Sequence, residues 1–448
     1  MYQEELSQPL LKSNGAQNIN QSNTLGGGEV SQRSFLNRTF GSLEKGSLAG
    51  STYQLSAAAI GAGVLSLPYV LKESGIILGL ILILIGAFAS ILSLKLLMKC
   101  SDMIQSTSYS DLVHKVYGHK HDRRLTILIL TGLSGSCITY QIIILRLVQS
   151  LAQTINLELY SLEYSILITF LIGFSIIAPL STHKEMSGFR YVSILSLASL
   201  FYILVVICIE LPAYARQNFS WDRINYVNVN LKTLQSFAIT FFAFQCHVEV
   251  IPIFDEMTDK SLGKQRYLAM RSVFINLFFF LSIGMGGYFS TYETTGQIVI
   301  ERQPLNGDKY DIFMVIGQFF IIMVLCIAYP INTVPMKTIL VQNIYHRKHE
   351  LSRQQNITIT YVFVLWTSVL AVLFPDITKV LSIMGGLCSV TICFLIPVSC
   401  YIKLHTKIGE KWSDNREHVR MAGFFGTLCV IGYSSVVYTV TDTISGLI

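Results

Sequence analysis

The sequence predicts an all-α membrane protein with about eleven transmembrane helices. Apolar residues make up 52% of the chain, charged residues make up 13%, and the mean hydropathy is +0.52. A soluble domain carries about 25% charged residues. The apolar residues also form separate blocks of about 20, the length at which a helix crosses about 30 Å of hydrocarbon. Membrane-barrel strands alternate in polarity and need only about ten residues, so helices are the predicted form.

The predicted spans alternate with short polar loops along the whole chain after residue 45. Several blocks, such as Ile76–Leu94 and Tyr164–Thr182, contain no charged residue. The predicted spans cover residues 50–71, 76–98, 125–154, 163–182, 190–211, 233–253, 270–292, 310–341, 357–374, 378–402 and 421–442.

The positive charges predict the orientation of these spans. With the N-terminus in the cytosol, the inside segments carry 25 of the 33 Lys and Arg residues and the outside segments carry 7. Arg146, the remaining one, lies near the outer end of span 3, where it can snorkel to the headgroups. Because cytosolic loops are enriched in Lys and Arg, the N-terminus is predicted to be cytosolic and the C-terminus to lie on the far side.

Two regions are predicted: a disordered cytosolic tail, 1–45, and a transmembrane domain, 46–448. The tail is rich in Ser, Asn, Gln and Gly and has too few apolar residues to form a core. The nine cysteines lie in or beside apolar spans, without CxxC or Cys/His metal spacing. No cofactor, no metal and no nucleic-acid partner is predicted, and the lipid bilayer accounts for the basic loops.

Span 1 contains a predicted break. The triplet Gly61-Ala62-Gly63 lies about ten residues into the span, near the membrane midplane, and Pro68 follows. Glycines lower the cost of leaving helical geometry, and a proline removes an amide donor and clashes one turn back, at Val64. Unwound backbone is tolerated at this depth only where it lines a polar cavity. An unwound segment is therefore expected here, with free carbonyls before it and a half-helix N-terminus after it.

Span 6 carries polar side chains at the same depth. Gln245, His247 and Glu249 lie near mid-membrane, ahead of Pro252. Ionisable groups inside a membrane are costly to bury and are functional candidates by default.

The two interrupted spans are five spans apart. This spacing indicates an inverted repeat, spans 1–5 against spans 6–10, with the binding site between the broken helices and one extra C-terminal helix. A half-helix N-terminus suits a carboxylate, and free carbonyls suit an ammonium group or a small cation. An α-amino acid carries both groups, so the pattern predicts an amino acid substrate.

Simpler interpretations compete with these. Gly61 and Gly63 could serve close helix packing, His247 could be a structural hydrogen-bonding residue, and Glu249 could form a structural ion pair. A different class of function also fits: a membrane-embedded amino acid sensor would use the same pocket to signal. An intramembrane enzyme lacks support, because no nucleophile–base pair, metal cluster or phosphate-binding loop is found in the sequence.

Four motifs resemble the amino acid/auxin permease family, over residues 45–448. Ile60–Tyr69 (IGAGVLSLPY) looks like its first-span signature, and Phe244–Met257 (FQCHVEVIPIFDEM) is similar to the sixth-span signature of its sodium-coupled neutral amino acid branch. Gly287–Ser290 (GYFS) and Tyr329–Lys337 (YPINTVPMK) look like its seventh- and eighth-span patterns. The resemblance implies eleven spans, a five-plus-five inverted repeat, and amino acid transport driven by Na⁺ or H⁺.

The chain departs from the sodium-coupled branch at two positions. Ala57 and Ala328 stand where that branch has an Asn and a Thr whose side chains are Na⁺ ligands. The first-span motif is most similar to that of vacuolar members of the family, which tend to use protons. Proton-coupled transport or uniport is therefore expected rather than Na⁺ coupling, in a vacuolar, lysosomal or plasma membrane. Glu249 and His247 are the candidates for proton coupling.

The expected function is a secondary transporter of small neutral amino acids that works by alternating access. Backbone groups around both breaks are the expected substrate contacts, and the side chains of Ser56, Gln245 and His247 join them. The full set of expected substrate-binding residues is Ser56, Ala59, Ile60, Gly61, Ala62, Gly63, Phe242, Phe244, Gln245 and His247.

Overall fold

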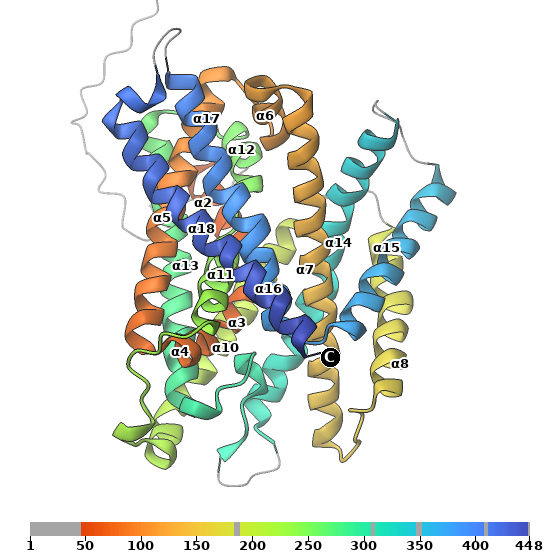
Figure 1. Cartoon of the computed structure of the whole chain (residues 1–448). Coiled ribbons are helices and arrows are strands. Elements are labelled where there is room, and N and C mark those ends of the chain that lie inside the picture. The colour runs from red at the N-terminus through yellow and green to blue at the C-terminus, as the bar shows by residue number, and fades with distance from the viewer. Residues whose placement is uncertain (1–45, 183–188, 306–309, 346–351, 407–410, 447–448) are drawn as a thin grey trace, which may run out of the picture. The chain divides into compact units, whose positions relative to one another are not determined.

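The computed structural model describes residues 46–182, 189–305, 310–345, 352–406 and 411–446, and these residues form helices joined by short loops with no strand among them. Figure 1 shows the bundle. The predicted disordered tail, 1–45, lies outside the described residues. The long helices are α5 (Ile76–Ile104), α7 (His119–Thr154), α10 (Phe189–Asn218), α13 (Leu262–Thr291), α14 (Ile312–Tyr345), α15 (Arg353–Leu373) and α18 (Arg416–Ser445).

The remaining spans are interrupted. Span 1 consists of α2 (Leu48–Ala59), α3 (Ala62–Leu65) and α4 (Leu67–Ser74), and span 6 consists of α11 (Lys232–Ala243) and α12 (His247–Asp255). Span 4 contains a π-helical turn, η1 (Gly173–Ile177), between α8 (Leu162–Ile172) and α9 (Ala178–Ser181). Span 10 contains two, η6 (Met384–Ser389) and η7 (Thr391–Leu395), between α16 (Ile377–Ile383) and α17 (Ile396–His405).

The predicted number of eleven spans is confirmed. Ten helices or helix pairs of the described chain are long and apolar enough to cross a membrane. Span 1 is the eleventh: its break leaves no single helix of sufficient length, although residues 48–74 together match the predicted span 50–71. The other predicted spans agree with the structure to within a few residues at most ends, and the helices extend further where polar turns carry them beyond the apolar block.

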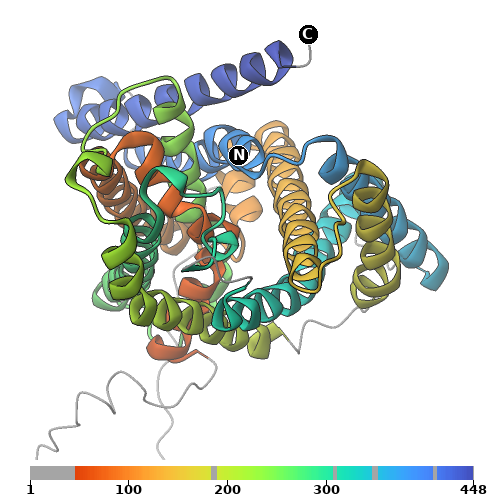
Figure 2. The same ribbon diagram turned by 90° about the horizontal axis from the view of Figure 1, so that it is seen from below.

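The packing of the helices has the symmetry of an inverted repeat. Four spans each pack against the span five positions later in the chain: span 1 against span 6, α5 against α13, α7 against α14, and α8 against α15. A twofold axis in the membrane plane produces this set of partners. The predicted five-plus-five inverted repeat with broken spans 1 and 6 is thereby confirmed, and Figure 2 shows the helices arranged around the broken pair.

One short helix lies outside the spans. The helix α6 (Tyr109–Tyr117) connects spans 2 and 3; its N-cap Ser108 accepts the amide of Asp111, and it buries Tyr109, Leu112 and Val113. Gly118, with φ +82°, provides the sharp turn into α7, because a left-handed backbone conformation costs glycine no side-chain clash.

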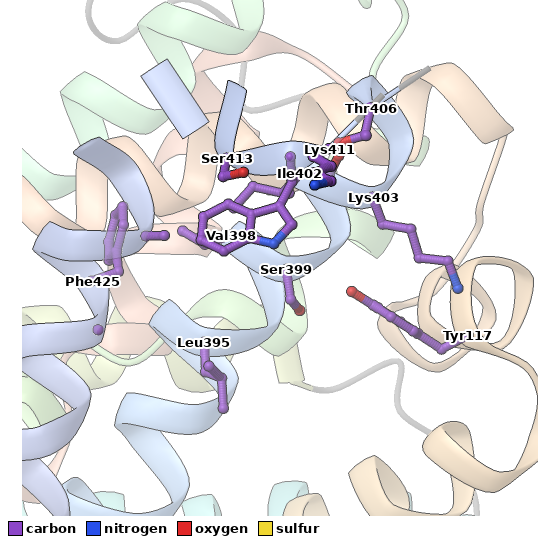
Figure 3. A pocket seen from close by; sticks show the side chains of 13 residues that line it. Tyr117, Leu395, Val398, Ser399, Ile402, Lys403, Thr406, Lys411, Ser413 and Phe425 are labelled. Carbon is purple, nitrogen blue, oxygen red and sulfur yellow. Dashed lines mark hydrogen bonds between the residues drawn. The ribbon is translucent and has the colours of Figure 1, made fainter. Parts of the chain in front are cut away.

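Span 11, helix α18, packs on spans 6 and 10 and belongs to neither repeat. Between α17 and α18, at the end of the bundle that carries α6, lies a groove of about 670 Å³ (Figure 3). None of the residues that line this groove belongs to either break.

Candidate functional site

The break in span 1 lies where the glycine triplet predicts it. Helix α2 ends at Ala59, and Ile60 is extended with φ −76° and ψ 99° while its amide still donates to the Ser56 carbonyl at 3.0 Å. Helix α3 begins at Ala62, after Gly61. The last carbonyls of α2 and the first amides of α3 consequently have no partner one turn away within their own helices. Acceptors and donors therefore face one short gap.

The break in span 6 covers Phe244–Cys246. Helix α11 ends at Ala243 and α12 begins at His247, so the unwound residues precede Pro252 by almost two turns. A neighbouring helix supports the irregular backbone, since the Ser90 hydroxyl of α5 donates to the Phe244 carbonyl at 3.3 Å. The first amides of α12 form a second half-helix N-terminus inside the bundle.

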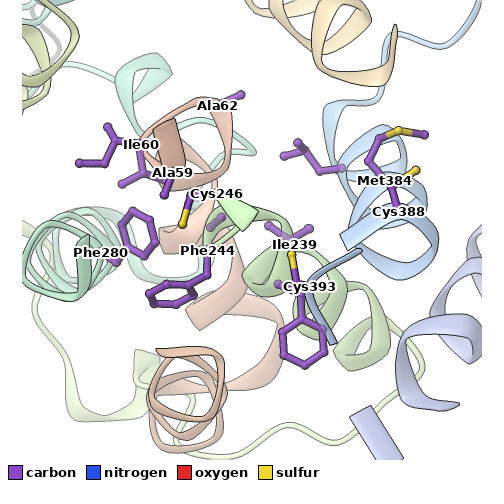
Figure 4. Packing of buried hydrophobic residues seen from close by; sticks show 14 of the residues in the cluster. Ala59, Ile60, Ala62, Ile239, Phe244, Cys246, Phe280, Met384, Cys388 and Cys393 are labelled. Atoms are coloured by element: carbon purple, nitrogen blue, oxygen red, sulfur yellow. The ribbon is translucent and has the colours of Figure 1, made fainter. Parts of the chain in front are cut away.

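The two breaks lie against each other. A Cβ atom at Gly63 would come within 2.9 Å of the Ala243 Cα atom, closer than such atoms pack, so the two backbones approach to a distance that only glycine permits here. Figure 4 shows Ala59 and Ile60 of span 1 beside Phe244 and Cys246 of span 6. The structure thus brings together the two segments that the sequence singled out.

Several predicted side chains point away from the gap. The Ser56 hydroxyl donates to the Ser272 carbonyl of α13 at 3.3 Å, and the His247 Nε2 atom lies 2.6 Å from the Ser93 hydroxyl of α5. Phe244 packs edge-on against Phe280, with ring centroids 4.8 Å apart. Each of these three side chains is buried, as are Ala59, Ile60, Ala62 and Gly63. Contacts with a substrate at these positions are therefore left to the backbone.

Other predicted residues remain accessible at the gap. Gly61, Phe242 and Gln245 are half-buried. A Cβ atom at Gly61 would meet only the Tyr140 hydroxyl oxygen, at the ordinary contact distance of 3.8 Å, so the structure has room for it. The Gln245 Oε1 atom accepts the Ser389 hydroxyl of span 10 at 2.5 Å, which fixes the amide beside the break.

The structure adds residues that sequence reasoning missed. Tyr140 of α7 lies opposite Gly61 and within hydrogen-bonding reach of Asn332 of α14. Ser389 lies in the π-helical turn η6, whose Gly385 sits so close to the Ala238 carbonyl that a Cβ atom would lie 1.9 Å from it. Asn332 falls inside the eighth-span motif and could have been selected from it. No periodicity marks Tyr140 or Ser389.

Glu249 occupies a different position from His247. Two residues apart on a helix, their side chains point in nearly opposite directions. His247 is fully buried, whereas Glu249 is exposed to solvent although it lies within electrostatic range of Tyr140 in the bundle interior. The expected His247–Glu249 pair is therefore not formed on one face, and Glu249 alone faces the accessible space.

The half-helices α2 and α12, on one side of the breaks, present exposed residues, and we call this set of residues the inner vestibule. We define it by the exposed residues Gln54 and Ala58 of α2, one turn apart, and Glu249 and Pro252 of α12. These two half-helices pack against each other, with α2 also on α10 and α13, and α12 also on α5 and α6. This side of the breaks is the one that carries α6 and α17, which the Lys and Arg distribution assigns to the cytosol.

The opposite end is covered by the loop between spans 7 and 8. We call residues 292–302 the outer lid; it contains η3 (Tyr292–Thr294) and η4 (Val299–Glu301). Ile298, Val299 and Ile300 are buried in it. Its anchors are hydrogen bonds from Lys72 Nζ to the Thr295 carbonyl at 3.1 Å, from Gln318 to the Ile300 carbonyl at 2.8 Å and from Gln297 to the Asp376 carboxylate at 2.9 Å.

Arg146 also holds the outer lid. Its guanidinium lies 3.7 Å from the Glu301 carboxylate and donates to the Pro375 carbonyl at 2.9 Å. The expectation that Arg146 snorkels to the headgroups stays a prediction, and these two contacts are additional to it. The carboxylate and the carbonyl that contact the Arg146 guanidinium belong to residues more than 150 positions later in the sequence. Sequence spacing does not reveal such contacts. The outer lid is thus held by contacts with several spans, whereas α2 and α12 present exposed residues at the inner vestibule.

One group of side chains among the described residues has the geometry of metal ligands. His114, His119 and Asp122, at the turn between α6 and α7, place their ligand atoms within 4.8 Å of one another. The spacing of these three residues in the sequence is not that of a familiar metal motif, because Gly118 turns the chain between His114 and His119. The group lies away from both breaks and has no part in the substrate path.

Comparisons with known proteins agree with this architecture. A family model described as transmembrane amino acid transporter protein matches residues 44–445. The sodium-coupled neutral amino acid transporter 7 of Xenopus laevis is 26% identical over 388 residues, which covers 81% of both chains.

Solved structures resemble the chain in fold. The manganese transporter of Eremococcus coleocola, crystallised with an aromatic bis-isothiourea compound, gives a TM-score of 0.55 at 12% identity and covers 89% of this chain and 87% of that one. A mutant of the same transporter gives a TM-score of 0.53 at 12% identity, with 88% and 87% covered. Such low identity shows a shared fold and nothing about the substrate.

Proposed function

We propose a function for this chain from the premise that it belongs to the family of transmembrane amino acid transporter proteins. It is therefore a multi-pass secondary transporter of amino acids. Beyond that, we propose that it moves small neutral amino acids by alternating access, with the substrate bound between the breaks of spans 1 and 6.

The observation that carries this proposal is the juxtaposition of the two breaks. The amides that begin α3 and α12 suit the substrate carboxylate, since a half-helix N-terminus carries about half a positive charge. The free carbonyls that end α2 and α11 suit the ammonium group. Side chains near the gap are neutral and polar, namely Tyr140, Gln245, Asn332 and Ser389, which favours a substrate without a charged side chain.

We propose coupling to a proton rather than to Na⁺. The Xenopus relative is named as sodium-coupled, but Ala57 and Ala328 offer no side-chain oxygen in this chain, and a hard cation needs several oxygen ligands. Glu249 is the carboxyl group on the vestibule face of α12, where it can exchange a proton with water as the site changes sides. His247 contributes its backbone amide to the site and its side chain to the contact with Ser93.

The proposed mechanism is a movement of the broken helices between two arrangements. With the outer lid closed, the inner vestibule releases substrate and a proton to the cytosol. Opening of the lid, with closure of α2 and α12 against α7 and α14, would expose the same gap to the other side. A pH gradient across a vacuolar, lysosomal or plasma membrane would drive accumulation.

Uptake into proteoliposomes tests the proposal. Purified protein should take up labelled neutral amino acids when a pH gradient is imposed, with Na⁺ replaced by choline. Glu249→Gln should keep substrate exchange but lose accumulation driven by pH, because glutamine keeps the shape and cannot titrate. Glu256→Gln, seven residues further on at the C-cap of α12, is the matched control and should accumulate like the parent protein.

Three outcomes would count against parts of the proposal. Accumulation that follows a Na⁺ gradient at constant pH, or full pH-driven accumulation by Glu249→Gln, would exclude the proposed coupling. Specific binding without any flux would instead favour an amino acid sensor that uses the same pocket.

A further inference from the structure

The groove between α17 and α18 has a polar mouth and an apolar floor. Its volume of about 670 Å³ falls within the range of about 300–1,000 Å³ typical of sites for small organic ligands. Lys403, Thr406, Lys411 and Ser413 lie at one end, and Leu395 and Phe425 lie toward the other (Figure 3).

The floor of the groove presents apolar surface toward the membrane. Leu395 is 44% exposed, although it lies in a helix that crosses the bilayer, and the buried Val398 and Phe425 lie behind it. Gly426 of α18 also lines the groove, and a Cβ atom there would meet nothing within 4 Å. The floor is therefore open to an apolar chain that enters along α18.

The mouth has the composition of a membrane–water boundary. Trp412 and Tyr117 line it, and aromatic residues of this kind concentrate at the headgroup level. The Lys403 ammonium lies 4.3 Å from the centre of the Tyr117 ring, and Lys411, which also lines the groove, is exposed. Two positively charged side chains thus line the same groove as the apolar floor residues.

We propose that this groove binds an anionic phospholipid, with its phosphate at Lys403 and Lys411 and an acyl chain along Leu395, Phe425 and Gly426. Charge complementarity selects the phosphate, and the apolar floor selects a lipid over a free anion. The groove lies at the end of the bundle that the Lys and Arg distribution assigns to the cytosol, and that leaflet is the anionic one. The site is separate from the substrate gap, so this inference does not depend on the proposed function.

Lipid retention by the full-length protein tests the inference. Protein delipidated in neutral detergent is titrated with phosphatidylserine or phosphatidylcholine, and bound lipid is counted by native mass spectrometry. We expect phosphatidylserine to bind more tightly than phosphatidylcholine. The double variant K403Q/K411Q should bind it about 25-fold more weakly, because a lysine near an anionic headgroup contributes about a fivefold factor.

A second variant tests the apolar floor without changing the charge. Gly426→Leu places a side chain in the open slot and should displace the lipid, whereas Gly423→Leu, a position that is equally open but does not line the groove, should not. K120Q/R123Q, which removes two exposed charges at the start of α7, is the charge-matched control and should bind normally. Folding is checked by the thermal midpoint of each variant.

Three binding results would contradict the assignment of an anionic phospholipid to this groove. Equal retention of phosphatidylcholine would exclude recognition of the phosphate charge. Inorganic phosphate that competes as well as the lipid would exclude the apolar floor as part of the site. Unchanged phosphatidylserine binding in both K403Q/K411Q and Gly426→Leu would place any lipid elsewhere on the protein.

Discussion

The two glycines of the span 1 triplet have different surroundings although the sequence presents them alike. Gly63 faces the backbone of Ala243 at a distance that excludes a Cβ atom, so its role is the close packing of spans 1 and 6. A Cβ atom at Gly61 would make only an ordinary van der Waals contact with the Tyr140 hydroxyl oxygen, at 3.8 Å. The Gly61 φ of −143° is negative and therefore lies outside the left-handed region that favours glycine. Gly63 therefore serves the close packing of spans 1 and 6. Gly61 remains the glycine that is predicted to contact the substrate.

Substitutions at these glycines should separate folding from transport. Gly63→Ala should lower the thermal stability by about 1–3 kcal/mol, the usual cost of overpacking a tight contact. Gly61→Val should leave stability unchanged and abolish uptake, because its branched side chain fills the space beside Tyr140. Thermal midpoints and uptake are measured for both variants in the same detergent and lipid. Normal substrate affinity in Gly61→Val would remove this residue from the site.

His247 should behave as a structural residue. Ser93→Ala removes the hydroxyl within 2.6 Å of its Nε2 atom and leaves a fully buried polar atom without that partner, at a cost of about 1–3 kcal/mol. We expect a lower thermal midpoint with an unchanged ratio of pH-driven to exchange uptake. A shift in that ratio would show that the Ser93–His247 contact takes part in coupling.

At the scale of elements, the outer lid joins spans that are distant in sequence. It connects span 1 through Lys72, span 3 through Arg146, span 8 through Gln318 and the start of span 10 through Asp376. Opening the outer side requires most of these contacts to break together. A change in the solution at the outer face, such as a change in pH, can therefore shift the equilibrium between the open and the closed lid.

Acidification of the outer face should favour the closed lid. Burial raises the pKa of the Glu301 carboxyl above its usual value of 4.5, and nearby Arg146 only partly opposes this effect. In an open lid the carboxyl meets water and its pKa returns toward the usual value. Glu301 thus binds a proton more tightly when the lid is closed than when it is open. Closure is therefore favoured as the pH falls through the raised pKa of the closed state toward 4.5, the usual pKa of the carboxyl group.

Distances between spin labels measure this equilibrium. Labels at Thr294 in the lid and Val229 in a neighbouring outer loop, both exposed, are placed in a Cys208→Ser background. In the parent protein the closed population should rise as the pH is lowered from neutral toward 4.5, the usual carboxyl pKa, whereas Glu301→Gln should stay closed throughout this range. A pH response of equal size in Glu301→Gln would assign it to another group.

At the scale of the whole molecule, the sequence predicted what the bilayer dictates. Span number, span ends and the break at Gly61 follow from hydropathy and glycine placement. The site was predicted less completely, because the direction of a side chain depends on neighbouring helices that the sequence pattern does not reveal. Ser56 and His247 have the polarity of ligands, yet α13 and α5 take up their hydrogen bonds. Tyr140 and Ser389 are brought to the site only by the packing of spans 3 and 10.

The predicted orientation, together with the positions of the vestibule and the lid, predicts from which side of the membrane a given residue can be reached. The Lys and Arg distribution predicts a cytosolic N-terminus, and an odd number of spans then predicts a C-terminus on the far side. With this orientation, the exposed residues of the inner vestibule lie toward the cytosol and the lid lies toward the outer face. A residue in the vestibule should consequently be reachable from the cytosol alone, and a residue on the lid from the outer face alone.

Cysteine labelling with a membrane-impermeant maleimide tests both statements at once. Of the nine cysteines eight are buried and Cys208 is exposed, so Cys208→Ser gives a background of low reactivity. In it, Ala58→Cys should react only from the face that exposes an N-terminal tag, and a neutral amino acid should slow the reaction because the substrate covers the adjoining gap. Glu293→Cys, exposed on the lid, should react only from the face that exposes a C-terminal tag. Reaction of Ala58→Cys from the C-terminal face, or both tags on one face, would contradict the orientation and the open vestibule on which the proposed transport cycle depends.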